Sequence, residues 1–134
     1  MPGEEEIRRA LELLRRSPLQ SPVRLAVMLL LAARHSMEFS DLQRALGVTP
    51  GNLWSHLEKL RKAGLVRVRY RPWPGQGPRM IVEATGEGLE ALFRHLHALR
   101  VLEEAAGSGR EEAGGSGAGA EEEAARLRRG SGAV

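Results

Sequence analysis

Cysteine is absent from this chain of 134 residues, and aromatic residues are scarce, with two Trp, one Tyr and two Phe. Without thiols there can be no disulfide framework, no thiolate metal site and no cysteine nucleophile. A hydrophobic fraction of 42% over this length is enough for one core. The sequence therefore predicts a single small domain and excludes disulfide-stabilised and iron–sulfur proteins.

Long hydrophobic runs are also lacking. The longest uncharged apolar run extends from Leu25 to Ala33 and lies between Arg24 and Arg34. It has less than half of the about 20 residues that a membrane-spanning helix requires. We therefore interpret it as a buried helix and expect no membrane partner. Because the chain has no cysteine, nothing in it argues for an oxidising compartment, and we expect a cytoplasmic location.

Acidic residues are sparse in the middle of the chain. Residues 1–20 are neutral overall, residues 21–82 carry ten Lys or Arg against three acids, and residues 83–134 carry six Arg against ten Glu. The net charge of +3 thus conceals a strongly basic middle between a neutral and an acidic end. Such a segment is typical of a surface that binds a polyanion.

Local helix signals are frequent in the first half of the chain. A first helix follows the acidic run near the N-terminus. A second begins after Ser21, a residue type that caps helices, with Pro22 at its first position. Ser40 and Gln43 have the spacing of a capping box and predict a short third helix that ends at Gly47.

The fourth predicted helix covers residues 50–63 and follows a three-residue turn. Thr49 is placed to cap it, and Pro50 occupies its first helical position. Its apolar residues recur on one face of a helix, which identifies the buried side; they are Leu53, Leu57 and Leu60.

After Gly64 the apolar period changes from helical to two, which is typical of a strand. Val66, Val68 and Tyr70 alternate with Arg67, Arg69 and Arg71. Residues 79–84 predict the returning strand, and the Pro- and Gly-rich residues between them a stiff loop. The fold class is therefore mainly α with a small antiparallel β-hairpin (α+β).

These elements divide the chain into four parts. Residues 1–20 form an N-terminal helix, 21–84 a helix-turn-helix core with a hairpin, and 85–106 a C-terminal helix capped by Thr85. Residues 107–134 are rich in Gly, Ala and Glu and contain almost no larger aliphatic residue. We predict that this last part is a disordered tail.

Five short stretches occur in the order of a known family. They are Ser21-Pro22-Val23-Arg24-Leu25, Phe39-Ser40-Asp41-Leu42, Gly51-Asn52-Leu53-Trp54-Ser55-His56-Leu57-Glu58-Lys59-Leu60, Ala63-Gly64-Leu65-Val66 and Thr85-x-Glu87-Gly88. Together they make the chain resemble the small winged helix-turn-helix transcriptional regulators related to the MarR and ArsR groups. The resemblance implies sequence-specific binding of double-stranded DNA, with the helix 50–63 in the major groove.

The outward face of the helix 50–63 carries side chains suited to base edges. Asn can pair bidentately with adenine, Ser with several bases, and Lys with guanine or phosphate. Trp54 flanks this face and can stack on sugar or on a neighbouring helix, whereas His56 is expected to be a half-buried packing residue. The predicted DNA-binding positions in and beside this helix are Thr49, Gly51, Asn52, Trp54, Ser55, Lys59 and Lys62.

The hairpin at 67–79 corresponds to the wing, which in this family contacts DNA beside the recognition helix. Its arginines suit phosphates or a narrow minor groove, and no acid lies between them in the sequence. The resemblance therefore adds Arg67, Arg69, Arg71 and Arg79 as DNA-binding candidates. Of these, Arg71 and Arg79 lie nearest the tip, where Trp73 and Gln76 are weaker candidates.

The two terminal helices carry apolar stripes outside the helix-turn-helix core. Such stripes would face water in an isolated chain and therefore predict a homodimer that reads two half-sites. The predicted interface residues are Ile7, Leu11, Leu14, Leu92, Leu96 and Leu99.

Catalytic, cofactor and metal signals are missing from the sequence. His95 and His97 lie about 200° apart around a helix and cannot chelate one metal ion. We therefore expect no enzyme and no cofactor, and no effector pocket can be identified. The alternative function is a winged-helix module that docks a partner protein; RNA binding is disfavoured because no aromatic stacking platform is present.

Overall fold

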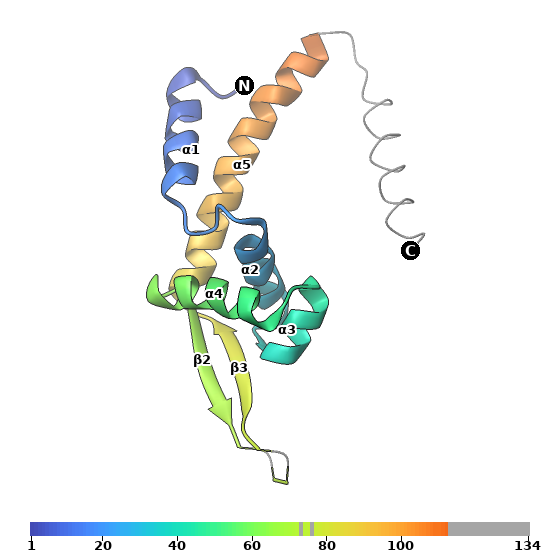
Figure 1. Cartoon of the computed structure of the whole chain (residues 1–134). Helices are drawn as coiled ribbons and strands as arrows, with labels where there is room; N and C mark the ends of the chain where they lie inside the picture. Colours follow the sequence, from blue (N-terminus) through green and yellow to red (C-terminus); the bar gives the residue numbers. More distant parts are fainter. Residues whose placement is uncertain (73, 76, 113–134) are drawn as a thin grey trace, which may run out of the picture.

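The computed structural model describes residues 1–72, 74–75 and 77–112. Its elements are α1 (Glu4–Arg16), α2 (Pro22–Arg34), β1 (Ser36–Glu38), α3 (Phe39–Leu46), α4 (Pro50–Lys62), β2 (Val66–Arg71), β3 (Arg79–Ala84) and α5 (Gly86–Glu112). Helices α2, α3 and α4 gather at the base of the hairpin, and α1 lies beside the far half of α5 (Figure 1). The predicted mainly α class with a small antiparallel hairpin is confirmed.

Three of the predicted helix caps are present. The Ser21 hydroxyl accepts a hydrogen bond from the Arg24 amide at 3.3 Å, and the Thr49 hydroxyl accepts one from the Asn52 amide at 3.2 Å. Thr85 caps α5 in the same way, accepting from the Gly88 amide at 2.9 Å. These local bonds satisfy amides at the helix N-termini and fix where α2, α4 and α5 begin.

Besides the predicted hairpin, the sheet contains β1, close to Met37-Glu38-Phe39, where the sequence predicts no more than one rung of a strand. Its order is β1-β3-β2 with antiparallel pairs throughout, and β1 pairs with β3 from Ser36 opposite Glu83 to Glu38 opposite Ile81. Because the chain passes directly from this strand into α3, the helix begins at Phe39, and no side chain caps it. The predicted capping box at Ser40 is therefore wrong.

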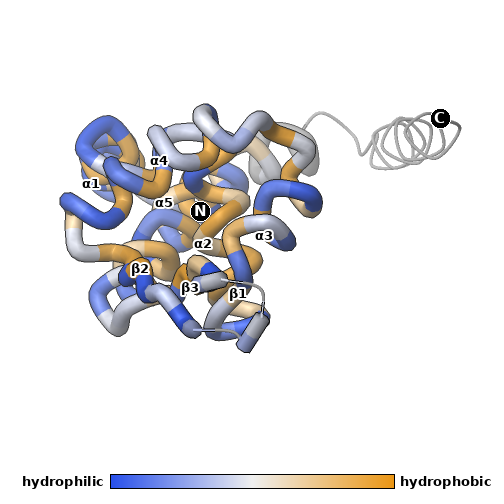
Figure 2. Tube along the Cα trace, turned by 60° about the horizontal axis from the view of Figure 1, so that its bottom comes forward, coloured by the Kyte–Doolittle hydropathy of each residue, from blue (hydrophilic) through white to orange (hydrophobic). Residues whose placement is uncertain are grey.

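The main core lies where α2, α4, the sheet and the first turns of α5 meet. In Figure 2 the hydrophobic stretches lie toward the inside, and α1 and α3 alternate hydrophilic with hydrophobic stretches. Apolar burial of this kind is the main favourable term in folding. The fully buried members include Leu19, Val27, Met28, Leu31, Leu42, Leu53, Leu57, Leu60 and Val82.

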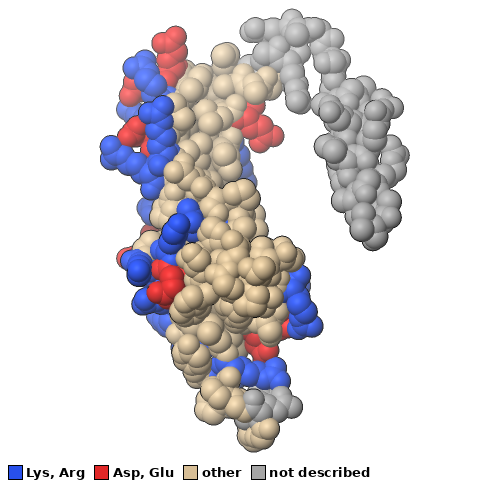
Figure 3. All heavy atoms as spheres, in the orientation of Figure 1, with Lys and Arg blue, Asp and Glu red and all other residues tan. Residues whose placement is uncertain are grey.

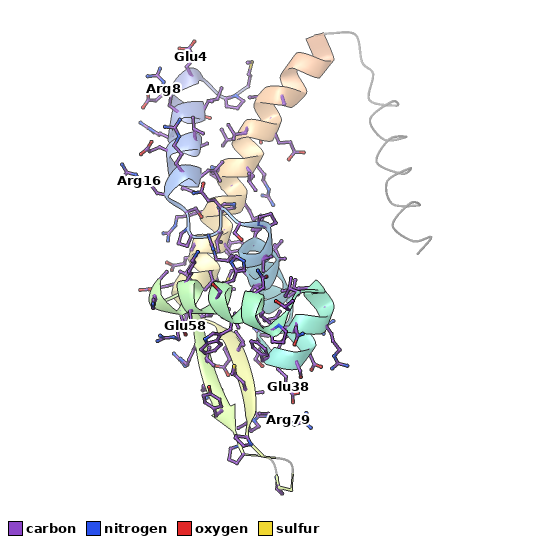
Figure 4. All side chains as sticks on the ribbon, viewed as in Figure 1. Glu4, Arg8, Arg16, Glu38, Glu58 and Arg79 are labelled. Carbon is purple, nitrogen blue, oxygen red and sulfur yellow. The ribbon has the colours of Figure 1, made fainter. Side chains whose placement is uncertain are left out.

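A second, smaller apolar cluster joins α1 to the far half of α5. Its buried residues are Ala10, Ala98 and Val101, with Leu13, Leu14 and Leu102 packed around them. The opposite side of α1 carries helical ion pairs such as Glu4 with Arg8 and Glu12 with Arg16, and it points away from α5 (Figure 4). Within the described residues, no helix is both long and apolar enough to cross a membrane.

Helix α5 differs from its prediction in two respects. It continues to Glu112, so that the predicted end at residue 106 falls six residues short. A helix already nucleated over several turns extends one residue at a time, even through glycine. Leu92 is 1% exposed and belongs to the main core, so its prediction as a dimer-interface residue is wrong. The remainder of the predicted tail, residues 113–134, lies outside the described residues.

The loop between α1 and α2 is held to α5 by a buried histidine. His95 is only 4% exposed, and its Nδ1 lies 2.8 Å from the Ser17 hydroxyl oxygen. That oxygen accepts a hydrogen bond from the Leu19 amide at 3.1 Å, so its own proton is available for a neutral imidazole. Burial lowers the pKa of His95, because the charged form loses its hydration.

We expect the protein to lose stability between pH 7.5 and pH 5.5. A histidine whose folded pKa is depressed stabilises the fold above its unfolded pKa of about 6.5, and that contribution is lost as the pH falls through the folded pKa. Thermal unfolding followed by circular dichroism should show a lower midpoint at pH 5.5. The variant His95→Asn, which keeps an acceptor near the position of Nδ1, should show a smaller pH effect. An unchanged pH dependence in that variant would mean that His95 does not carry the effect.

Candidate nucleic-acid interface

The outward side of α4 is one continuous exposed face. Its apolar side is fully buried through Leu53, Leu57 and Leu60, which fixes what the rest of the helix presents. The exposed residues are those that the sequence predicts, and Trp54 is 38% exposed among them; the set is Thr49, Gly51, Asn52, Trp54, Ser55, Lys59 and Lys62. The structure therefore brings together the predicted DNA-binding positions of this helix.

The first turn of α4 leaves room for close approach of a ligand. A Cβ atom built on Gly51 would meet no heavy atom within 4 Å. Asn52 and Ser55 follow on the same exposed surface, and the backbone dipole at this end of the helix favours an anion. Small and hydrogen-bonding groups thus occupy the end of α4 that a base edge or phosphate could reach.

His56 is half-buried at the edge of this face, as predicted. Its Nδ1 lies 3.1 Å from a guanidinium nitrogen of Arg24 in α2. Burial lowers the pKa of His56 first, and the positive charges of Arg24 and Lys59 lower it further. His56 therefore faces α2 as a neutral hydrogen-bond acceptor and is not part of the exposed face.

The hairpin places its arginines on the side of the sheet opposite α4 and the main core. Val66 and Val82 belong to the main core with the leucines of α4, so alternate positions point the other way. Arg67, Arg69, Arg71 and Arg79 occupy those alternate positions. Arg71 and Arg79 lie opposite each other at the end of the hairpin that extends beyond α4 in Figure 1.

Two of these arginines are paired with acids from other strands. Arg69 pairs with Glu83 of β3. Arg79 donates to both carboxylate oxygens of Glu38 in β1, at 2.9 and 3.1 Å, and the two side chains lie side by side in Figure 4. The sequence shows no acid between Arg67 and Arg79, but pairing across the sheet supplies two.

The unpaired cations of the basic middle are fewer than the sequence suggests. Asp41 pairs with Arg44, and Glu58 with Arg61. Within the described residues, the cations of segment 21–82 that make no ion pair are Arg24, Arg34, Lys59, Lys62, Arg67 and Arg71. In Figure 3, Lys and Arg gather along α1, at one end of α4 and across the hairpin, with acids interspersed.

Tyr70 is a candidate that the sequence interpretation missed. It belongs to the apolar face of β2 and pairs with Met80, yet it is 63% exposed because the hairpin extends beyond the core at that point. It therefore lies on the same side of the sheet as α4. A tyrosine hydroxyl can donate to a phosphate oxygen. Its position at the last apolar site before the Pro-rich loop is the signal that could have identified it. Trp73 and Gln76 lie outside the described residues.

The terminal helices expose part of the predicted dimer surface. Leu11 is 42% exposed and Leu99 is 39% exposed, and Phe93 on α5 is 63% exposed. The other predicted residues, Ile7, Leu14 and Leu96, are half-buried within the chain itself. In the part of the chain that the structure describes, no three His, Asp or Glu side chains gather as metal ligands.

Known proteins share both the sequence pattern and the fold. Residues 23–102 match the family model of a winged helix DNA-binding domain. The chain is 36% identical to the transcriptional regulator homologue protein from Pyrococcus horikoshii OT3, with a TM-score of 0.66 over 72% of this chain and 96% of that one. It is 25% identical to a MarR-family protein from Enterococcus faecalis V583, with a TM-score of 0.57 over 84% and 94%.

A more distant structure shares the fold alone. The PcaV transcriptional regulator from Streptomyces coelicolor is 18% identical, with a TM-score of 0.63 over 84% of this chain and 75% of that one. None of the curated proteins matches the sequence.

Proposed function

This chain belongs to the family of winged helix DNA-binding domains, and from that premise we propose that it is a transcriptional regulator that reads a specific duplex sequence as a homodimer. The observation that carries this proposal is the exposed face of α4. Gly51, Asn52 and Ser55 are exposed near the start of this helix, whereas its leucine stripe is fully buried. A helix-turn-helix protein inserts this end of the helix into the major groove. Asn and Ser are then placed to read base edges.

The wing supplies positioning contacts in this proposal. Arg71 lies at the end of β2, is exposed and makes no ion pair in the described part of the chain, so its charge is available to a phosphate or a narrow minor groove. Arg79 is held by Glu38 and acts chiefly in keeping the hairpin against β1. Lys59 and Lys62 extend the positive charge along α4 toward the flanking phosphates.

The homodimer is supported by the apolar surface of the terminal helices. Exposed leucines on both α1 and α5 would be covered by a second copy. A two-fold dimer presents two copies of α4 and so reads an inverted repeat. Binding of the second half-site is then intramolecular, which raises the overall affinity.

Selection of bound duplexes from a random pool tests the proposed function. We expect an enriched inverted repeat whose two halves are about one helical turn apart. Enrichment of a single half-site would contradict the dimer but leave sequence reading intact. If no duplex is enriched over the pool, the alternative of a module that docks a partner protein becomes the better account.

Asn52→Ala and Arg71→Ala should weaken binding in different ways. Loss of Asn52 should reduce affinity for the selected duplex by roughly 1–3 kcal/mol and leave affinity for a scrambled duplex unchanged. Loss of Arg71 should weaken both duplexes and make the dependence of log affinity on log salt shallower by about one. Titrations at four salt concentrations measure both quantities.

Arg69→Ala is the matched control for the wing. Arg69 lies two residues from Arg71 on the same strand face, but its charge is already neutralised by Glu83. We expect its removal to leave the salt dependence close to that of the parent protein. Equal effects of the two arginine variants would mean that ion pairing within the sheet does not decide which arginine meets DNA.

A further inference from the structure

One arginine connects three parts of the fold beneath the recognition helix. Arg24 lies in the first turn of α2, and its Nε donates to the Pro18 carbonyl at 2.6 Å. One of its terminal nitrogens lies 3.1 Å from Nδ1 of His56, near the middle of α4. Pro18 belongs to the loop between α1 and α2. A single side chain therefore ties this loop to α4.

The same loop is fixed on its other side by α5. Ser17 precedes Pro18 directly, and its hydroxyl lies 2.8 Å from Nδ1 of the buried His95. Adjacent residues of one loop thus contact the long C-terminal helix and, through Arg24, the recognition helix. This makes a continuous polar connection between the terminal helices and α4.

Apolar packing sets which side of α4 is buried, and a directional bond restrains the rotation of the helix further. Leu53, Leu57 and Leu60 are fully buried, but the hydrophobic effect has no direction. A hydrogen bond to His56 does have direction. His56 follows Ser55 and lies one turn after Asn52, so a bond to its ring restrains the rotation of the turn that carries both of those residues.

We propose that Arg24 is a positioning residue for DNA reading: by bridging the Pro18 carbonyl and the His56 imidazole, it holds α4 in the rotation that presents Asn52 and Ser55 to base edges. This inference rests on the proposed function. Arg24 is half-buried and makes no ion pair within the described residues; the hydrogen bonds of its guanidinium there are those to Pro18 and His56.

The chemistry of His56 fits this role. As a neutral imidazole, it offers the Nδ1 lone pair to the guanidinium. Burial and the charges of Arg24 on α2 and Lys59 on α4 itself lower the pKa of His56, so the neutral form persists into mildly acidic solution. Protonation would turn Nδ1 into a donor that faces another donor, and the link would be lost.

Arg24→Met tests the role directly, because it keeps much of the apolar stem and removes both hydrogen bonds. We expect the ratio of affinities for the selected duplex and a scrambled duplex to fall about tenfold, with the salt dependence unchanged. A direct phosphate contact would instead make that dependence shallower by about one. The control is Arg15→Met, an exposed arginine of α1 outside the ion pairs of the described residues; it should leave the ratio unchanged.

Substitutions of His56 separate positioning from general stability. His56→Leu removes the acceptor and should reduce the ratio as Arg24→Met does, and the double variant should lose no more than either single variant. His56→Asn keeps an acceptor near Nδ1 and should preserve the ratio. The parent protein should lose discrimination only where the pH falls below the usual range of histidine and His56 is protonated, whereas His56→Asn should keep its discrimination there. Urea unfolding of every variant provides the stability for comparison.

The outcomes are distinguishable. An unchanged ratio in Arg24→Met, additive losses in the double variant, or a shallower salt dependence would each overturn the positioning role while leaving the proposed function standing. If the parent protein enriches no duplex, the positioning role falls together with the proposed function. Should Arg24→Met fail to fold, the contrast between His56→Leu and His56→Asn decides the question.

Discussion

Replacing Gly88 with alanine is expected to destabilise the protein by about 3 kcal/mol or more. A Cβ atom at this position would lie 2.0 Å from the Leu65 carbonyl oxygen and 2.9 Å from its carbon, and it would also crowd Met28. Backbone atoms cannot move aside as the end of a side chain can. Gly88 is therefore required by the close approach of α5 to the segment that enters β2.

The clash would also break the contacts that hold α5 to the sheet. The Leu65 carbonyl accepts a hydrogen bond from the Thr85 amide at 3.1 Å, and the Thr85 hydroxyl donates to the Gly64 carbonyl at 2.6 Å. Moving α5 away from Leu65 sacrifices both. Urea unfolding at pH 7.5 measures the loss.

Gly86→Ala is the matched control for this prediction. Gly86 begins the same helix two residues earlier, and a Cβ there would meet nothing within 4 Å. Alanine has a higher helix propensity than glycine, so the free energy of unfolding of this variant should equal or slightly exceed that of the parent protein. Similar stabilities of the two variants would mean that α5 does not pack against Leu65 as described.

Glutamate at both Leu11 and Leu99 is expected to produce folded monomers that bind the selected duplex at least about 100-fold more weakly. Both side chains are exposed on the isolated chain, so the charges should cost its fold little. In a dimer they would be buried without partners, which is strongly unfavourable. Sedimentation velocity and duplex titration of the same sample measure both effects.

Leu29→Glu provides the comparison, because Leu29 is 43% exposed on α2, outside the terminal helices. This variant should remain dimeric. A dimer that survives the double substitution would place the interface elsewhere. A parent protein that sediments as a monomer at micromolar concentration would contradict the homodimer itself.

The parts of the fold that follow from neighbouring residues could be predicted from the sequence. Thr49, Pro50 and the leucine spacing determine where α4 begins and which side is buried, because caps and helical periodicity act within one or two turns. The alternation after Gly64 gives the strand and its two faces for the same reason. The exposed residues of α4 follow directly from these local rules.

Contacts between distant residues could not be predicted in this way. Glu38 and Arg79 are 41 positions apart and meet only because β1 joins the sheet beside β3. Nothing local to the arginine-rich strand reveals that Glu83 will neutralise Arg69. The charge available to DNA therefore depends on the strand order, which the sequence pattern does not specify.

Leu92 illustrates a second limit. The sequence predicts the apolar stripe of the C-terminal helix as one surface, but α5 passes from the main core to the smaller cluster with α1, and its buried side changes along the way. Leu92 lies in the main core, whereas Leu99, two turns later, is exposed. Periodicity identifies an apolar stripe but not the element that covers each part of it.

The length of α5 has a mechanical consequence. With 27 residues it is about 40 Å long, and it is a member of both apolar clusters. A continuous helix transmits tilt as a lever does, so a rotation of about 5° would move a point 13 residues away by nearly 2 Å. A displacement of the end of α5 beside α1 therefore also moves the end of α5 that packs against the sheet. In the proposed dimer, the angle of this helix would thus set the distance between the two copies of α4. A change of that angle would move both copies relative to their half-sites at the same time.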